Sequence, residues 1–168
     1  AIAAARTRNR KPEAVLAVLP FDNESYAAEM NYFSDGVADE IISTLLRQSK
    51  IKVIGRISAF QFRGERKHQA AAELKASHVL DGSVRLSGDR MRVSVQLIEA
   101  ATGVALWSER YDGDRNNAFA LEDEIAAKVA GSLRRSLAQS DRASNPIDPA
   151  AYDLFLRARQ IWLMMSDI

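Results

Sequence analysis

The chain of 168 residues contains no cysteine. Disulfides, zinc ribbons, thiolate catalysis and cysteine-ligated iron–sulfur clusters are therefore excluded. Only two histidines occur, His68 and His78, and neither belongs to an HExxH motif or has a carboxylate at metal-ligand spacing. We expect both histidines to be structural or exposed, and we predict neither a metal site nor a cofactor.

An excess of one charge and long apolar runs are also lacking. Lysine and arginine number 23 against 22 aspartate and glutamate, so the formal net charge is +1 and nucleic acid is not an expected partner. No apolar run approaches the roughly 18 residues of a membrane span, so membrane contact is expected only through a segment outside this chain. GxSxG and glycine-rich phosphate loops are absent too, and we predict no catalytic residues.

What the chain does contain is a long stretch of β-strand pattern, from His78 to Asp112. Apolar and polar residues alternate in it, and turns at 87–89 and 100–103 divide it into three runs. We predict an antiparallel meander of three strands. Helices elsewhere in the chain are expected to cover one of its faces, because its aliphatic side chains would otherwise remain in water.

The segment before the meander predicts a parallel pair of strands. Residues 14–21 form a continuous apolar run, which is typical of a strand buried on both faces. Apolar spacings of three and four predict a helix over 32–50, followed by a second strand at 51–55. A helix between two strands of one sheet favours a parallel pair. The predicted fold is α+β, with a mixed sheet made of this β-α-β pair and the meander, and with helices packed on the sheet.

Two further helices are predicted over 67–77 and 119–137 from their apolar spacing. Residues 57–66 are expected to be irregular, with Phe60 and Phe62 folding back on the core. Residues 114–117 are expected to form a turn or a cap.

Ser34 or Asp35 is expected to cap the helix over 32–50. Asp35, Asp39 and Glu40 then fall in its first turns, where carboxylates favour the positive end of the helix dipole. These acids therefore need no catalytic explanation.

Six residues are candidates for contact with a ligand or partner. Asp22 and Asn23 follow the first strand, and the other four lie in the meander: Asp81, Trp107, Glu109 and Arg110. The last three of these, together with Tyr111 and Asp112, are placed to line a ligand cleft beside the turn after the first strand. A plainer interpretation makes Trp107 and Tyr111 core aromatics flanked by an exposed ion pair, and makes Asp81 part of a solvated or helix-covered polar edge.

The two ends of the chain are expected to lie outside this domain. Residues 1–13 carry Arg6, Arg8, Arg10 and Lys11 and predict a basic linker, either a solvated tether or a segment that contacts anionic lipid. Residues 140–149 predict a second linker. Residues 150–168 are predicted to begin a further region, with an amphipathic helix over 150–165 whose apolar side is expected to pack on this domain or on a second copy of the chain, which would make a homodimer. We expect the sequence to be a piece of a longer protein.

Several motifs appear in a fixed order along residues 14–139: AVLPFDN, YFSDGVADEIISTL, KVIGRISAFQFRG, VLDGSVRLSGDRMRVSVQLIEAATGVALWSERYDGD and FALEDEIAAKVAGSL. This series resembles the TolB amino-terminal-domain-like family, also called FlgO-like. Residues 151–162, AYDLFLRARQIW, look like the opening helix of a tetratricopeptide repeat.

The resemblance implies a mixed sheet with helices, in a multidomain bacterial protein between a signalling module and tetratricopeptide repeats. Such proteins include class III adenylate cyclases and winged-helix regulators, often with a transmembrane segment before this domain. The family has no established catalytic residues, which implies a non-catalytic sensory or protein-interaction domain whose partner is another protein or its own repeat array. The alternative is a domain that binds a sugar, peptide or nucleotide.

The resemblance also implies a membrane-anchored protein with this domain in the periplasm. The basic residues of 1–13 favour the cytoplasmic side instead if a membrane span precedes them.

Overall fold

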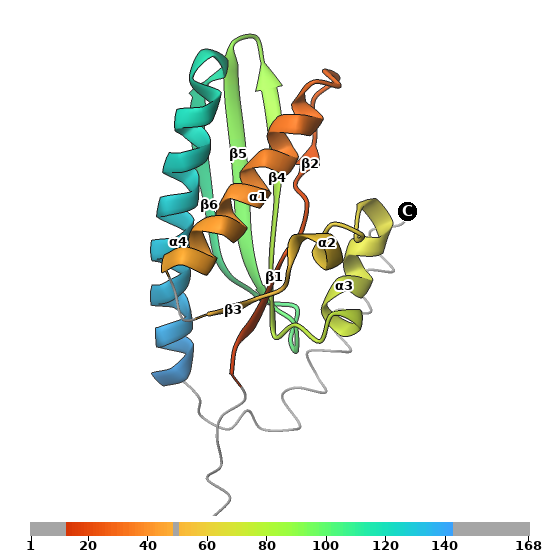
Figure 1. The fold of residues 1–168 in the computed structure, drawn as a ribbon, viewed down its shortest axis with the longest axis vertical. Helices are drawn as coiled ribbons and strands as arrows, with labels where there is room; N and C mark the ends of the chain where they lie inside the picture. Colours follow the sequence, from red (N-terminus) through yellow and green to blue (C-terminus); the bar gives the residue numbers. More distant parts are fainter. Residues whose placement is uncertain (1–12, 49–50, 143–168) are drawn as a thin grey trace, which may run out of the picture.

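The computed structural model describes residues 13–48 and 51–142. Within these ranges one mixed sheet carries helices on both of its faces, but to different extents (Figure 1). In chain order the elements are β1 (Val15–Val18), β2 (Asp22–Asn23), α1 (Met30–Gln48), β3 (Lys52–Val53), α2 (Arg56–Ala59), the 3-10 turn η1 (Gly64–Arg66), α3 (Lys67–Glu73), β4 (His78–Ser87), β5 (Arg90–Glu99), β6 (Ala105–Asp114), the 3-10 turn η2 (Arg115–Asn117) and α4 (Ala118–Arg142).

The strands run in the order β3-β1-β4-β5-β6, and β2 pairs with the outer half of β4. β1 is parallel to β3 and to β4, whereas β4, β5 and β6 form an antiparallel meander. The predicted α+β class is therefore confirmed, with both its parallel pair and its three-stranded meander. β1 belongs to the parallel pair and also pairs with β4, and so joins the pair and the meander into one sheet.

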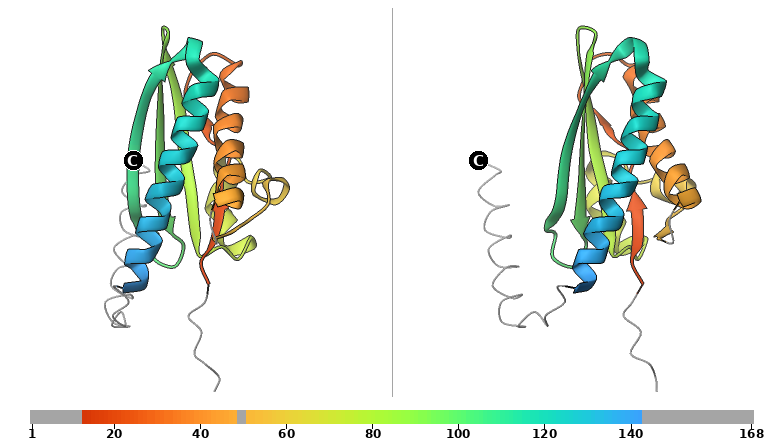
Figure 2. Two further views of the ribbon diagram at one scale, coloured as in Figure 1. Left: turned by 60° about the vertical axis from the view of Figure 1, so that its left-hand side comes forward. Right: turned by 90° about the vertical axis from the view of Figure 1, so that its left-hand side faces the viewer.

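Helices α1 and α4 lie side by side on one face of the sheet (Figures 1 and 2). The meander presents alternate aliphatic side chains to them, including Leu80, Val84, Val93 and Leu97, all fully buried. The helices add Ile41 and Leu45 from α1 and Ile125 and Leu133 from α4. The apolar side chains that recur every second residue in the strands thus pack against those that recur every 3.6 residues in the helices, and together they form one apolar core.

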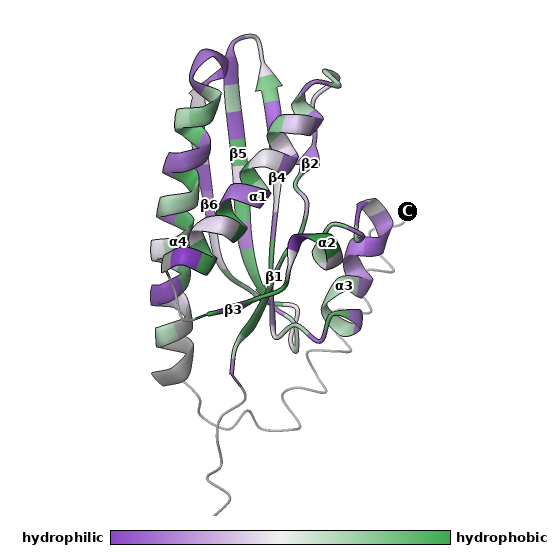
Figure 3. Ribbon diagram, in the orientation of Figure 1, coloured by the Kyte–Doolittle hydropathy of each residue, from purple (hydrophilic) through white to green (hydrophobic). Residues whose placement is uncertain are grey.

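The opposite face of the sheet has a smaller core at the β1 side only. Ala17, Leu19 and Val79 point to this face and pack against Phe62 and Ala70 from the α2–α3 region. β1 is thus covered on both faces, which explains its continuous apolar run (Figure 3). The prediction that Phe62 folds back on the core is confirmed, and Phe60 packs at the edge of the main core.

Helix α1 begins at Met30, so the predicted caps Ser34 and Asp35 lie inside it and that prediction is wrong. The side chain of Asn23 instead shapes the loop before the helix. Its amide donates to the Ala27 carbonyl at 3.0 Å and its Oδ1 accepts from the Ser25 N–H at 2.9 Å. With the chain already turned at 23–27, the helix starts earlier than its apolar spacing indicates.

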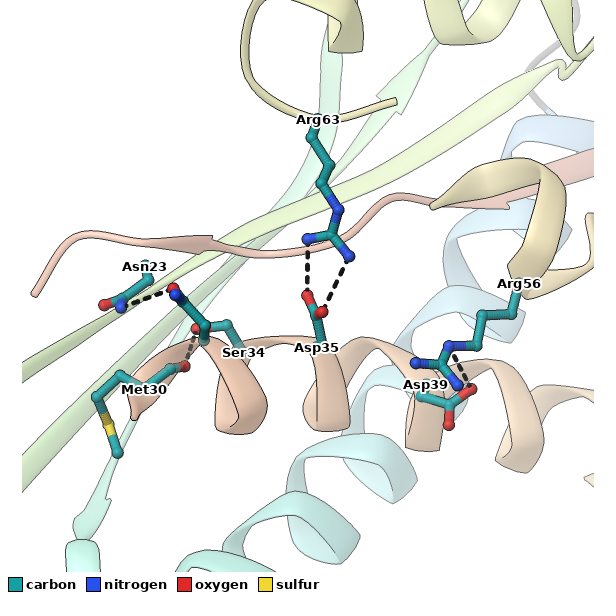
Figure 4. Close-up of polar contacts among 8 residues, drawn as sticks. Asn23, Met30, Ser34, Asp35, Asp39, Arg56 and Arg63 are labelled. Carbon is teal, nitrogen blue, oxygen red and sulfur yellow. Dashed lines mark hydrogen bonds and ion pairs between the residues drawn. The ribbon is translucent and has the colours of Figure 1, made fainter. Parts of the chain in front are cut away.

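Ser34, now one turn into the helix, donates to the Met30 carbonyl at 2.7 Å (Figure 4). No acidic residue lies in the first turn of α1. The dipole explanation for Asp35 and Asp39 is therefore wrong. Both carboxylates bind arginines from the segment after β3 instead: Arg63 donates to Asp35 at 3.0 and 2.9 Å, and Arg56 lies 3.6 Å from Asp39.

The segment 57–66 is more ordered than expected, because α2 and η1 occupy much of it. The ion pairs to α1 and the stacking of Arg56 and Arg63 on Phe60, at 5.0 and 5.5 Å from its ring centre, hold it in place. Helix α3 ends at Glu73, four residues before the predicted end. Lys75 takes a positive φ of 53° there and turns the chain into β4.

At the carboxyl end, α4 continues to Arg142 and so overlaps the start of the predicted linker 140–149. The turn expected at 114–117 is present as η2, and the Asp114 side chain accepts from the Asn116 N–H at 2.9 Å. The predictions for residues 1–12 and 150–168 lie outside the described residues. Among the helices of the described ranges, none combines the length and the hydrophobicity that a membrane span requires.

Candidate functional site

The candidate site is the face of the meander opposite α1 and α4, which we call the open face. No described helix lies over its outer part, as the side views show (Figure 2). Here the strands present the polar half of their alternation. In the sheet register Asp81 pairs with Gln96 and Gln96 with Ser108, while Ser83 pairs with Ser94.

A pocket of about 290 Å³ lies on the open face, between β2 and the meander. Small polar side chains and three carboxylates line most of it. The lining residues are Asp22, Glu24, Asp81, Gly82, Ser83, Ser94, Val95, Gln96 and Ser108. Its hydroxyl, amide and carboxylate groups suit the binding of a polar or cationic group through hydrogen bonds.

Lys67, the first residue of α3, fixes the acidic side of this pocket. Its ammonium lies 2.7 Å from Asp81 Oδ1 and 3.0 Å from Asp22 Oδ2, and its side chain is only 11% exposed. Asp81 Oδ1 also accepts from the Gly82 N–H at 2.8 Å. One lysine thus joins α3, β2 and β4 and holds two pocket carboxylates in fixed positions.

The segment 23–25 is tied to β4 by two further contacts and to α1 by one. The Glu24 N–H donates to the Val84 carbonyl at 2.8 Å, and the Leu86 N–H donates to Ser25 Oγ at 2.6 Å. The Asn23 amide donates to Asn31 at 3.0 Å, which links the loop to α1 (Figure 4). These contacts make the β2 wall of the pocket part of the folded sheet.

The structure divides the six candidate residues among three places. Asp22 and Asp81 line the pocket, whereas Asn23 shapes the neighbouring loop. Trp107 packs at the edge of the main core. Glu109 lies on that same side of β6, where its carboxylate accepts from the Tyr111 hydroxyl at 2.6 Å. Arg110 points to the open face, on the opposite side of β6 from Trp107 and Glu109, and none of these three residues lines the pocket.

Tyr111 shows a shifted pKa on the α4 side of β6. Burial, the hydrogen bond to Glu109 and its negative charge all raise the pKa of the Tyr111 hydroxyl. The hydroxyl therefore stays protonated and holds Glu109 as an acceptor. This is a structural role, as expected for a core aromatic.

Sequence reasoning missed Glu24, Lys67 and the three pocket serines. The signal for the serines was present, because Ser83, Ser94 and Ser108 all fall on the polar parity of their strands. Their meeting depends on the register between strands, which the alternation alone does not give. The sequence pattern identified Lys67 only as the first residue of a predicted helix.

The described residues hold no cluster of three groups suited to a metal ion. A serine–histidine contact does occur, between Ser77 Oγ and His78 Nδ1 at 2.8 Å. Ser77 Oγ also accepts from the Val15 N–H at 2.8 Å and contacts the Val15 carbonyl at 3.1 Å. This serine therefore ties β1 to β4.

At the outer end of the open face, the hydrogen bond and charge of Arg92 lower the pKa of Asp112.

Solved structures with the same arrangement define the class of fold. TolB from Acinetobacter baumannii superimposes with a TM-score of 0.51 at 14% identity, over 76% of this chain and 29% of that chain. Protein XCC0632 from Xanthomonas campestris gives 0.54 at 10% identity, over 77% of this chain and 88% of that one. The chain thus has the mixed α+β fold found in part of TolB, as the sequence resemblance implied.

The family follows from the sequence itself. Residues 12–128 match the model of the second domain of HilA/YgeH-like transcriptional regulators, and the chain belongs to this family. It is also 38% identical over 157 residues to the protein named "Putative adenylate cyclase 3" of Rhizobium meliloti (strain 1021). The match covers 90% of this chain and 27% of that protein, so the chain spans about a quarter of this relative.

Proposed function

We propose that this domain is a non-catalytic sensory and protein-interaction module of a bacterial regulator, and that its open face is the contact surface. The observation that carries the proposal is the polar face of the meander with its pocket, whose outer part no described helix covers. The family match supports a place in a regulatory protein. A similar protein is named "Putative adenylate cyclase 3", which is consistent with the same domain occurring in a second kind of signalling protein.

A photo-crosslinking residue placed at Ser108 in the full-length protein tests this proposal. Ser108 is exposed at the edge of the pocket, so a bound partner should be captured there. Leu46 on α1 is 60% exposed on the helix side and provides the matched control position. Capture of a protein, or of the chain's own repeat array, from Ser108 and not from Leu46 is expected. Equal capture from both positions, or capture from Leu46 alone, would contradict the proposal.

The pocket favours a second candidate function, the binding of a small polar ligand. A volume of about 290 Å³ suits a sugar, an amino acid or part of a nucleotide. A thermal-shift screen of the whole chain against these classes and short peptides tests it. A ligand at a hundred times its dissociation constant adds about 2.7 kcal/mol. Ser108→Trp should fill the pocket and abolish such a shift, whereas Leu106→Trp, outside the pocket, should preserve it; no shift with any class would reject this function.

We also propose that the full-length protein is membrane-anchored, with this domain in the periplasm and tetratricopeptide repeats after residue 150. The sequence resemblance supports this placement, whereas the basic residues of 1–13 favour the cytoplasm as the alternative. Alkaline phosphatase and green fluorescent protein fused in turn after Arg142 of the full-length protein distinguish the two sides. Phosphatase activity with a dark fluorescent fusion is expected, and the opposite result would place the domain in the cytoplasm.

A further inference from the structure

A second surface lies on the other side of the molecule, on the outward side of α1 and α4. Tyr32 of α1 and Phe119 of α4 are 87% and 84% exposed. Tyr26, in the loop that leads to α1, is fully exposed as well. Large aromatic side chains left in water together mark a surface that another molecule covers. We call this surface the aromatic end.

Tyr32 and Phe119 lie near the starts of α1 and α4, one turn before the place where the two helices contact each other. Both helices begin at the same end of the molecule (Figures 1 and 2). Gly36, one turn after Tyr32, contacts Glu122, one turn after Phe119; a Cβ at Gly36 would lie 2.7 Å from Glu122 Oε1. Because Gly36 has no side chain, α1 leaves a notch in which the Glu122 carboxylate rests, one turn after Tyr32 and Phe119 along the two helices.

The charges around this notch are acidic and incompletely paired. Glu122 is half-buried, and burial together with Glu40 and Asp123 raises its pKa to about 7. Glu40 binds Arg47, and Glu124 binds Lys128. Among the residues that the structure describes, no lysine or arginine bonds to Glu122 or Asp123.

We propose that the aromatic end docks a protein segment that carries lysine or arginine. Aromatic faces attract a cationic side chain, and the Glu122 and Asp123 carboxylates complete its ion pairing. An anionic lipid surface or a nucleic acid would place like charges together. So would a second copy of the chain docked through the same surface. This inference does not depend on the open face, which lies on the opposite side of the sheet.

Two matched peptides test the proposal with the whole chain. One carries two arginines a helical turn apart, and the other has citrulline at both positions, which keeps the shape and removes the charge. We expect the arginine peptide to bind at least about tenfold more tightly in calorimetric titrations, corresponding to about 1.4 kcal/mol. Higher salt should weaken it, because the surface pair is screened.

Variants locate the binding surface. Glu122→Gln, Tyr32→Ala and Phe119→Ala should each weaken the arginine peptide about tenfold. Glu124→Gln, which alters an exposed carboxylate already paired with Lys128, should leave the affinity unchanged. Ile57→Ala removes an equally exposed apolar side chain on α2 and should also have no effect. All five positions are at the surface or half-buried, and circular dichroism confirms that each variant folds.

Several results would overturn the proposal. These are equal affinity for the two peptides, no binding at millimolar concentration, or binding by Glu122→Gln as tight as by the unmodified chain. If Asp81→Asn abolished binding of the arginine peptide while Glu122→Gln preserved it, the binding site would lie on the open face. Sedimentation of the chain with vesicles of anionic lipid, or a dimer that Tyr32→Ala dissociates, would assign the aromatic end to another occupant.

Discussion

Replacement of Lys67 by methionine should destabilise the fold by removing the cation that joins Asp81 and Asp22 at the pocket. Methionine keeps much of the aliphatic side chain but leaves Asp81 and Asp22 without their shared partner. Asp81 is the more buried of the two, with 22% of its side chain exposed against 55% for Asp22. The loss of stability should therefore come mainly from the unpaired carboxylate of Asp81.

The magnitude lies between two limits. An exposed ion pair contributes about 0–1 kcal/mol, and removal of one partner from a buried pair costs about 3–5 kcal/mol. Lys67 is nearly buried while one of its partners is half-exposed, so we expect the free energy of unfolding to fall by about 2 kcal/mol. In a chain of this length that corresponds to a melting temperature lower by about 4–8 °C.

Urea unfolding followed by circular dichroism measures the effect. Arg85→Met is the matched control, because Arg85 lies 3.8 Å from Glu24 with both side chains largely exposed, and its loss should cost less than about 1 kcal/mol. Adding Asp81→Asn to Lys67→Met should restore part of the stability by removing the unpaired carboxylate. If Lys67→Met cost no more than Arg85→Met, the bridge would not hold the pocket together.

Three other changes test separate parts of the structure. Gly82→Ala should cost about 1–3 kcal/mol in urea unfolding. Its Cβ would lie 2.6 Å from the opposite carbonyl oxygen and 2.8 Å from the Phe21 ring, whereas Gly55→Ala, with no atom within 4 Å, should cost far less. Arg63→Met should lower the melting temperature only slightly, since its ion pair is exposed and contributes at most about 1 kcal/mol. Because Glu122 has a pKa raised from 4.5 to about 7, the folded state holds its proton more tightly, and stability should fall as pH rises through that interval. Glu122→Gln should flatten this dependence between pH 5 and pH 8, and an unchanged slope would exclude Glu122 as its source.

The predictions that succeeded depend on periodicity over long segments. The central strand β5 alternates buried and less buried residues over most of its ten positions, so its apolar residues had to point to one covered face. The continuous apolar run of β1 likewise predicted a strand covered on both sides, and both cores contain its residues. These patterns show which residues are buried, and burial can be inferred from the residue type at each position without knowledge of its partners.

The predictions that failed depend on particular side-chain contacts, some within a loop and some between residues far apart in the chain. The start of α1 follows from the hydrogen bonds of Asn23, which the apolar spacing of the helix does not reveal. Asp35 was assigned to the helix dipole, yet it binds Arg63, which lies 28 positions later in the chain. The pocket likewise requires the register that places Ser94 opposite Ser83. A sequence pattern contains no direct record of such pairings.

The position of the pocket follows from where the second layer of helices ends. On the face opposite α1 and α4, the α2–α3 region covers Val79 of β4. Two residues further along the same side of the strand stands Asp81, which meets Lys67 at the first residue of α3. Ser83 is the next residue on this side of β4. Helix α3 no longer covers the strand there, and the side chains are polar instead of apolar. The Lys67–Asp81 pair therefore marks the border between the covered and open parts of this face, and a cavity forms there because β2 stands beside an uncovered stretch of β4. A change that extended the apolar cover past Asp81 would remove the pocket without altering the sheet.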